Sequence, residues 1–270
     1  MADERYDLPE EEEQDNRRGI RIILIILAVI LLVFGGIYTG YYFYSSYEAL
    51  KEEESLSQVT VTQPSTTEAQ ALIDNPIDFK TLWETNADVI GWLQVPDTKV
   101  DYPIVQHGYD DSFYLKHSAV DQSWKSSGAI YTELCNFKDF TDRVTVIYGH
   151  NGYSDTMFTT LHYFEKADFF NEHEFFYIYR PGEKLTYRIV SAFKYDDRHI
   201  MNSFDFHQPS VFAEFEEMIM NPQTTAKNVR ELEQPLGAND KIVVLSTCIT
   251  NQKSNRYLVC GVLMKNEKTN

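Results

Sequence analysis

The longest apolar stretch of the chain lies near its N-terminus. Residues 22–47 contain no charged side chain, and residues 22–34 are apolar without interruption. As a helix, residues 22–47 would be about 39 Å long, enough to cross the roughly 30 Å of hydrocarbon in a bilayer. Arg17, Arg18 and Arg21 precede the stretch, and tyrosines crowd its far end. The pattern predicts a transmembrane signal anchor over residues 22–44.

The flanking charges also predict an orientation. Because Lys and Arg accumulate on the cytoplasmic side of a membrane, residues 1–21 are expected to be a cytoplasmic tail and the chain beyond the anchor extracellular. A cleaved signal peptide is a weaker interpretation, since the apolar stretch is long and lacks an A-x-A-like cleavage site. A buried core helix would not explain the arginine and tyrosine flanks.

Beyond the anchor the pattern changes twice. Residues 45–70 are charged and then rich in Ser, Thr and Gln, with no sustained apolar period, which predicts a linker. Residues 71–270 form the expected extracellular domain, with no second linker inside it. Short apolar or alternating runs predict eight strands there, over residues 89–95, 101–106, 128–131, 144–148, 175–179, 185–193, 242–247 and 257–264. A mainly β domain, either a barrel or a sandwich, is therefore expected.

Two helices accompany these strands. Residues 78–84 predict a short helix before the first strand. Residues 210–220 carry Val211, Phe212, Phe215, Met218 and Ile219 at helical spacing, which predicts a stripe facing the core. This second helix interrupts the strand series just before its last two members.

Composition and charge narrow the function classes. With 43% hydrophobic and 14% aromatic residues, the chain has ample material for a core. The formal net charge is −17, which repels a phosphate backbone, so nucleic acid is not an expected partner. Residues 1–70 hold 13 acidic and 5 basic side chains, and the acidic N-terminal tail is interpreted as a solvated segment. Three cysteines, Cys135, Cys248 and Cys260, are too few for a disulfide framework.

Three reactive side chains fall at the ends of predicted strands. His150 follows one strand, Cys248 ends the next to last, and Arg256 opens the last. Only seven residues separate Cys248 from Arg256, so an antiparallel hairpin can bring the thiol and the guanidinium together. A thiol is a strong nucleophile, a histidine can protonate a leaving amine, and an arginine can stabilise an oxyanion. Taken alone, a cysteine in a buried strand is more often a small hydrophobic residue.

Several motifs together resemble a known family. The segments YGHN (148–151), LSTC (245–248) and NRYLV (255–259) follow an apolar anchor in the order and approximate spacing of the sortases, particularly those of class B. VIGWL (89–93), PDT (96–98) and DYPIVQ (101–106) resemble the family's first strand pair. The helix over 210–220 resembles the insertion that marks class B. Where the family often has Asn after Asp before its Tyr-Leu pair, this chain has Asp110 and Asp111, so no side-chain contact is carried over there.

The resemblance implies an eight-stranded sortase β-barrel and a thiol-dependent cysteine transpeptidase. It implies that Cys248 attacks the threonine carbonyl of an NPxTx-like C-terminal sorting signal, that His150 is the acid and base, and that Arg256 holds the oxyanion. Leu115, Ser246 and Thr247 are candidates for the substrate groove. The implied partners are secreted proteins that bear this signal and a lipid-linked peptidoglycan precursor that supplies the acceptor amine. The implied location is the membrane of a Gram-positive bacterium.

Other readings of the sequence stay open beside this one. A pilin-polymerising class B sortase would use a lysine amine as acceptor, and an inactive sortase-like surface protein would only bind. The remaining histidines show no zinc-ligand spacing, so no metal or cofactor is expected and they are interpreted as surface or structural residues: His107, His117, His162, His173, His199 and His207. Cys135 and Cys260 are also expected to be structural. The NPQTT segment at 221–225 resembles a sorting signal, but it lacks the apolar span and basic tail that such a signal needs.

Overall fold

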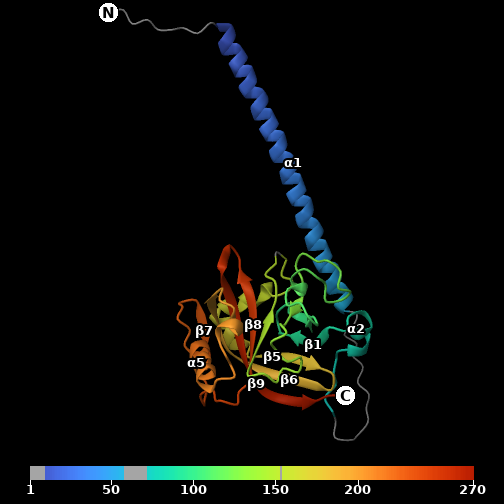
Figure 1. The fold of residues 1–270 in the computed structure, drawn as a ribbon, viewed down its shortest axis with the longest axis vertical. Helices are drawn as coiled ribbons and strands as arrows, with labels where there is room; N and C mark the ends of the chain where they lie inside the picture. Colours follow the sequence, from blue (N-terminus) through green and yellow to red (C-terminus); the bar gives the residue numbers. More distant parts are fainter. Residues whose placement is uncertain (1–9, 58–71, 153) are drawn as a thin grey trace, which may run out of the picture. The chain divides into compact units, whose positions relative to one another are not determined.

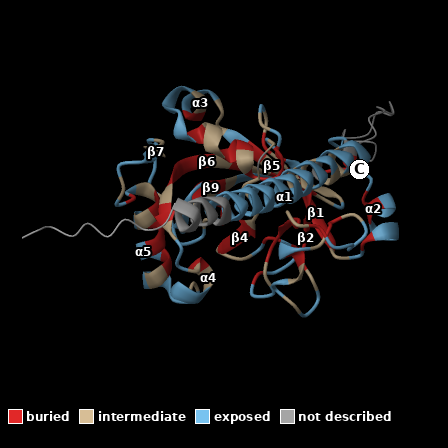
Figure 2. Cartoon of the chain, turned by 90° about the horizontal axis from the view of Figure 1, so that it is seen from above, coloured by how far each residue is buried: buried red, intermediate tan, exposed pale blue. Residues whose placement is uncertain are grey.

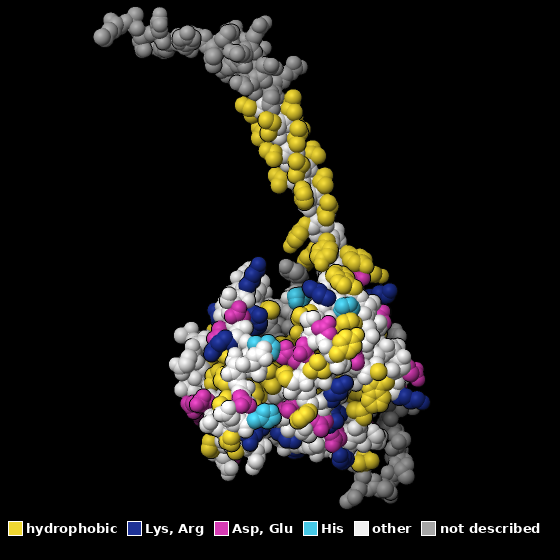
Figure 3. Space-filling model, viewed as in Figure 1, with side chains coloured by type: hydrophobic (Ala, Val, Ile, Leu, Met, Phe, Trp, Pro, Cys, Tyr) yellow, Lys and Arg dark blue, Asp and Glu magenta, His cyan; other side chains and the backbone are white. Residues whose placement is uncertain are grey.

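A single long helix occupies the N-terminal part of the protein. The computed structural model describes residues 10–57, 72–152 and 154–270, so the predicted tail is described only from residue 10. Helix α1 runs over Glu10–Ser57, and its apolar part, Ile20–Leu56, is long enough to cross a membrane or to act as a signal. Leu31 and Leu32 are 72% and 76% exposed, and hydrophobic side chains cover this part of the helix (Figure 3). Residues 1–47 form one compact unit and residues 48–270 a second.

The second unit is built around a closed barrel (Figure 1). Its strands among the described residues are β1 (Val89–Gln94), β2 (Asp101–Val105), β3 (Ile130–Tyr131), β4 (Val144–Tyr148), β5 (Phe175–Arg180), β6 (Glu183–Asp196), β7 (Lys227–Val229), β8 (Ile242–Ile249) and β9 (Gln252–Lys268). Eight of them follow one another in the order β5-β1-β2-β3-β4-β8-β9-β6, and the pairing of β5 with β6 closes the ring. The predicted eight-stranded barrel is confirmed, and β7 adds a short edge strand beside β6.

Helices cover the ends and one side of this barrel. They are α2 (Phe79–Thr85), η1 (Phe113–Leu115), η2 (Thr159–Glu165), α3 (Ala167–Glu172), α4 (Ile200–Ser203) and α5 (Pro209–Met220). The Asp78 side chain caps α2 by accepting from the Thr81 N–H, which explains why a helix begins there. The predicted helices over 78–84 and 210–220 correspond to α2 and α5.

Both faces of the central strands are buried (Figure 2). Side chains alternate along a strand, so neighbours such as Val244 and Leu245 point to opposite faces. Leu245 belongs to the larger of two hydrophobic clusters, and Val244 belongs to the smaller, which also contains Phe215 of α5. This arrangement explains why β8 reads as a continuous apolar run and confirms the core-facing stripe of α5.

The last turns of α1 belong to the second unit. Residues 45–57 of the predicted linker are helical, and residues 58–71 lie outside the described part of the chain. Leu56 is 4% exposed and packs in the larger cluster. Lys125 forms an ion pair with Glu52, and the Ser118 hydroxyl donates to the same carboxylate at 3.1 Å. The helix end is thus packed against the segment that follows η1.

Candidate active site

Cys248 stands where β8 reaches the rim of the barrel. The strand is buried over residues 242–247, including Ser246 and Thr247, and Cys248 is the first exposed residue. In the antiparallel pairing of β8 with β9, Cys248 lies directly opposite Arg256. The hairpin expected from their spacing is therefore present, and it brings the thiol and the guanidinium to the same rim.

His150 reaches the rim from the neighbouring strand. β4 and β8 are parallel, with Tyr148 opposite Ser246, so the residues that follow both strands emerge side by side. The contact continues beyond the strands, because the Gly149 N–H donates to the Ser246 carbonyl at 3.1 Å. The Thr247 hydroxyl in turn donates to the Gly149 carbonyl at 2.9 Å. These two hydrogen bonds hold the backbone just before His150 against β8, next to Cys248.

A glycine before His150 is required by packing. A Cβ at Gly149 would come within 2.5 Å of the Phe158 ring and 2.6 Å of Ile130 Cδ1. Carbon atoms in contact normally lie about 3.5–4.0 Å apart, so no larger residue fits without moving these neighbours. The close approach of Phe158 therefore determines how the backbone enters the His150 position.

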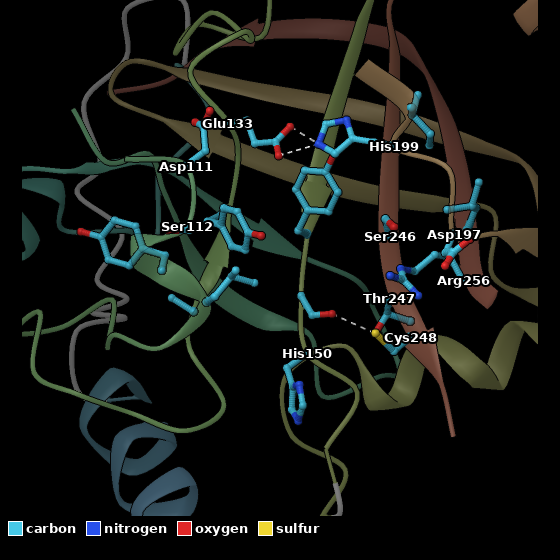
Figure 4. Close-up of a pocket in the computed structure, with 18 of the residues that line it drawn as sticks. Asp111, Ser112, Glu133, His150, Asp197, His199, Ser246, Thr247, Cys248 and Arg256 are labelled. Atoms are coloured by element: carbon cyan, nitrogen blue, oxygen red, sulfur yellow. Dashed lines mark hydrogen bonds and ion pairs between the residues drawn. The ribbon is translucent and has the colours of Figure 1, made fainter. Parts of the chain in front are cut away.

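The imidazole of His150 is turned away from the thiol (Figure 4). Within the described chain, no hydrogen bond joins His150 to Cys248. The ring is partly open to solvent, yet desolvation on its protein side lowers its pKa below the usual value, and the charge of Lys116 lowers it further. His150 therefore favours its neutral form, and a side-chain rotation is needed before it can exchange a proton at the thiol or at a substrate.

The Arg256 guanidinium is oriented by backbone carbonyls. Its Nη1 donates to the carbonyls of Lys253 and Asn255 at 3.1 and 3.0 Å. Among the described residues it forms no ion pair, so its charge is not neutralised by a neighbouring carboxylate. Figure 4 shows Arg256 beside Cys248. A guanidinium in this position can donate to an oxygen that becomes negative when the thiol attacks a carbonyl.

These side chains share one cavity of about 400 Å³. It is lined by all six residues predicted from the sequence, His150, Cys248, Arg256, Leu115, Ser246 and Thr247. Leu115 is half exposed, so its apolar side chain is available to a ligand. Asp111 also lines the cavity, where it accepts from the Leu134 N–H at 2.6 Å. The cavity accommodates an extended peptide segment more readily than a flat surface would.

A polar cluster that no sequence pattern predicted lies at one end of this cavity. The His199 ring, interpreted from the sequence as surface or structural, lies with its Nε2 2.7 Å from a Glu133 carboxylate oxygen. The Tyr148 hydroxyl donates to the other oxygen at 3.2 Å (Figure 4). Burial and the Glu133 charge raise the pKa of Tyr148 well above its usual value. Glu133 and His199 are 66 residues apart in loops, and no motif connects them.

The other two cysteines lie in environments that oppose ionisation. Cys260 is fully buried, which raises the pKa of its thiol to about 12. Cys135 is exposed at its surface, but partial desolvation and the charge of Glu133 raise its pKa to about 11. All three cysteines are free, and only Cys248 lines the cavity. A thiol, an imidazole and a guanidinium at one peptide-sized cavity are together able to perform acyl transfer through a thioester.

Comparisons with known proteins agree with this arrangement. A family model described as a sortase domain matches residues 93–264. The chain is similar to sortase B of Listeria monocytogenes, with 26% identity over 189 residues that cover 69% of this chain and 74% of the relative. It is also similar to the structure of Clostridium perfringens sortase B, with 27% identity, a TM-score of 0.60, and coverage of 70% of this chain and 100% of that one. A Streptococcus pyogenes class B sortase involved in pilus biogenesis is 30% identical, with a TM-score of 0.58 and coverage of 69% and 97%.

Proposed function

Because this chain belongs to the sortase family of cysteine transpeptidases, and to class B within it, we propose that Cys248, His150 and Arg256 carry out its acyl transfer. The proposal rests on one observation, that the three side chains lie at the same rim of the barrel. The parallel pairing of β4 with β8 and the antiparallel pairing of β8 with β9 bring the three side chains to one cavity.

The first half of the reaction forms a thioester. After rotation toward the thiol, the neutral His150 imidazole takes the Cys248 proton. The resulting thiolate attacks the carbonyl carbon of the threonine in a sorting signal, and the carbonyl oxygen becomes negative. The Arg256 guanidinium donates to that oxygen. The C–N bond then breaks, and the protonated His150 gives its proton to the departing amine. The second half reverses these roles, because His150 takes a proton from an incoming amine that attacks the thioester and releases the sulfur.

The substrate we propose is an NPxTx-like signal at the C-terminus of secreted proteins. The acceptor is an amine of a lipid-linked peptidoglycan precursor, and the product is a protein joined to the cell wall. Three features support this assignment: class B membership, the size of the cavity and its half-exposed Leu115. The predicted orientation, with residues 1–21 cytoplasmic, 22–44 in the membrane and 71–270 extracellular, would place the site on the same side as these substrates.

A second acceptor is favoured by one comparison. The similar Streptococcus pyogenes class B sortase is involved in pilus biogenesis. A lysine side chain of a pilin subunit is a primary amine like that of a peptidoglycan bridge, and the same chemistry would serve both. An inactive binding protein is disfavoured, because Cys248 is exposed in the cavity and Arg256 lies opposite it.

Mass spectrometry of the full chain in detergent micelles tests the proposal. The protein would be incubated with NPxTx and LPxTx peptides, alone or with triglycine or a lysine-containing peptide. We expect an acyl adduct on Cys248 and an amine-exchanged product, and we expect neither from Cys248→Ala. The preferred acceptor distinguishes wall anchoring from pilin assembly. If no peptide gives an adduct while Cys248 alkylates readily, the proposed substrate is wrong, and alkylation-resistant Cys248 would contradict the nucleophile assignment.

A further inference from the structure

A second histidine lies behind the nucleophile candidate, outside the cavity. His162 is in η2, and its Nε2 is 3.1 Å from the backbone carbonyl oxygen of Cys248. Its Nδ1 is 2.6 Å from a Glu165 carboxylate oxygen. The ring stacks on Tyr257, with 5.0 Å between the ring centroids. Three neighbours thus hold this imidazole against the back of residue 248, although its role is not evident from any sequence motif.

The contacts determine which atoms of His162 donate. An ionised carboxylate only accepts hydrogen bonds, so Nδ1 carries a proton and donates to Glu165. With that proton on Nδ1, Nε2 accepts from the Asn151 side-chain nitrogen, which lies 3.2 Å away. The same nitrogen is 2.9 Å from the Cys248 carbonyl oxygen and donates to it. His162 therefore holds the Asn151 amide against the Cys248 carbonyl.

The backbone at Cys248 needs such support. The register of the β8–β9 ladder shifts between Cys248 and Ile249, so regular pairing ends at the nucleophile. Beyond a shift of this kind, strand hydrogen bonds no longer fix the direction of the next peptide group. Asn151, which directly follows His150, and His162 supply the missing restraint from the side.

We propose that His162, held by Glu165, is a positioning residue that keeps Asn151 against the Cys248 carbonyl and thereby presents the thiol to Arg256 and to the substrate. The inference rests on the proposed nucleophilic role of Cys248. It predicts that the acceptor at the Nε2 position of His162 matters more than the ring itself. Loss of that atom releases Asn151 and lets residue 248 shift, which slows the attack of the sulfur but leaves the rest of the groove intact.

A matched pair of substitutions separates the two nitrogens. In His162→Gln the side-chain amide reaches the position of Nε2 and its oxygen can still accept from Asn151, whereas in His162→Asn it reaches only the position of Nδ1. His173 offers a control, because it is comparably buried at 17% against 20%, stacks on Phe169, and contacts the carboxylate of Asp97. The full chain carrying His162→Gln, His162→Asn or His173→Asn would be compared with the parent protein.

Two readouts keep the inference separate from the proposed substrate. The first is the rate at which iodoacetamide labels Cys248, followed by peptide mass, which needs no sorting signal. The second is kcat and KM for the peptide that the parent protein accepts. We expect His162→Asn to lower kcat about tenfold, the effect of losing one hydrogen bond, with KM within about twofold. Its labelling rate should fall as well, while His162→Gln and His173→Asn stay within about threefold of the parent.

Two results would overturn the inference. One is a His162→Asn variant with parental labelling and parental kcat. The other is an equal loss in His162→Asn and His162→Gln, accompanied by an equal fall in melting temperature, which would make the ring a packing element only. If the parent protein accepts no peptide, the labelling comparison still decides the inference, so its failure is distinct from failure of the proposed function.

Discussion

Substitution of Gly149 by alanine tests the link between packing and catalysis most directly. The added methyl group would lie 2.5 Å from two atoms of the Phe158 ring and 2.6 Å from Ile130 Cδ1. Relief of these overlaps requires movements of about 1 Å, since normal carbon contacts are about 3.5–4.0 Å. Phe158 is fully buried, so its rigid ring has nowhere to go without moving other core side chains.

The expected cost has two parts. Overpacking of this kind typically lowers the free energy of unfolding by about 1–3 kcal/mol, which urea denaturation of the full chain would measure. The backbone also carries His150, and a catalytic group misplaced by about 1 Å can slow a reaction on the order of 100-fold. We therefore expect a loss of acyl transfer that exceeds the loss of folded protein.

A compensating change provides the control. Phe158→Ala removes Cγ and Cδ2, the two ring atoms in the overlap, so the double variant should be more stable than the sum of the two single changes by about 1 kcal/mol. The reasoning would be refuted by a Gly149→Ala protein with parental stability and transfer rate. It would also be refuted by strictly additive single changes, because the structure places the two groups in direct overlap.

Three further predictions concern charge, proton affinity and the helix end. Arg256→Lys should lower kcat more than tenfold despite its retained charge, because the planar guanidinium that donates to the carbonyls of Lys253 and Asn255 is lost. Steady-state kinetics with the accepted peptide measure this effect, and near-parental turnover would contradict it. Lys116→Met should raise the pKa of His150, because the nearby positive charge of Lys116 disfavours the imidazolium form. NMR titration of the ring protons measures this pKa, and a lower or unchanged value would contradict the assigned cause. Leu56→Ala should lower the free energy of unfolding of the second unit by about 2–4 kcal/mol, because Leu56 is 4% exposed in the larger hydrophobic cluster. Urea denaturation of the full chain measures this change, and a value below about 0.5 kcal/mol would contradict the packing.

The fold was largely predictable because strands and helices leave local patterns. Alternation and short apolar runs located all eight barrel strands, and the seven residues between Cys248 and Arg256 indicated their hairpin. The two longest strands were underestimated: β6 extends over Glu183–Asp196 and β9 over Gln252–Lys268, whereas the predictions covered 185–193 and 257–264. The polar residues at the C-terminal end of β9 lie in the sheet because β6 pairs with them, which a single-strand pattern does not reveal.

The site was only partly predictable, because much of it depends on contacts between distant segments. His150 and Cys248 could be proposed from motifs, but their proximity comes from the parallel pairing of β4 with β8. Parallel strands are joined by long crossovers, so no local turn signal reports their register. The contact of His199 with Glu133 and that of His162 with the Cys248 carbonyl also join distant segments, so the sequence does not predict them. Side-chain type marked these residues as possible donors, and only the fold decides where they point.

The parallel pairing of β4 with β8 also has a consequence for the order in which the protein is made. The two strands are separated by almost 100 residues, so their contact has a high sequence separation and forms late in folding. A growing chain that has completed β4 already contains His150 but has neither the thiol nor the strand beside it. The barrel closes, and the reactive groups meet, only after β8 and β9 have been synthesised. Biosynthesis itself therefore delays the appearance of reactivity until these two strands have emerged.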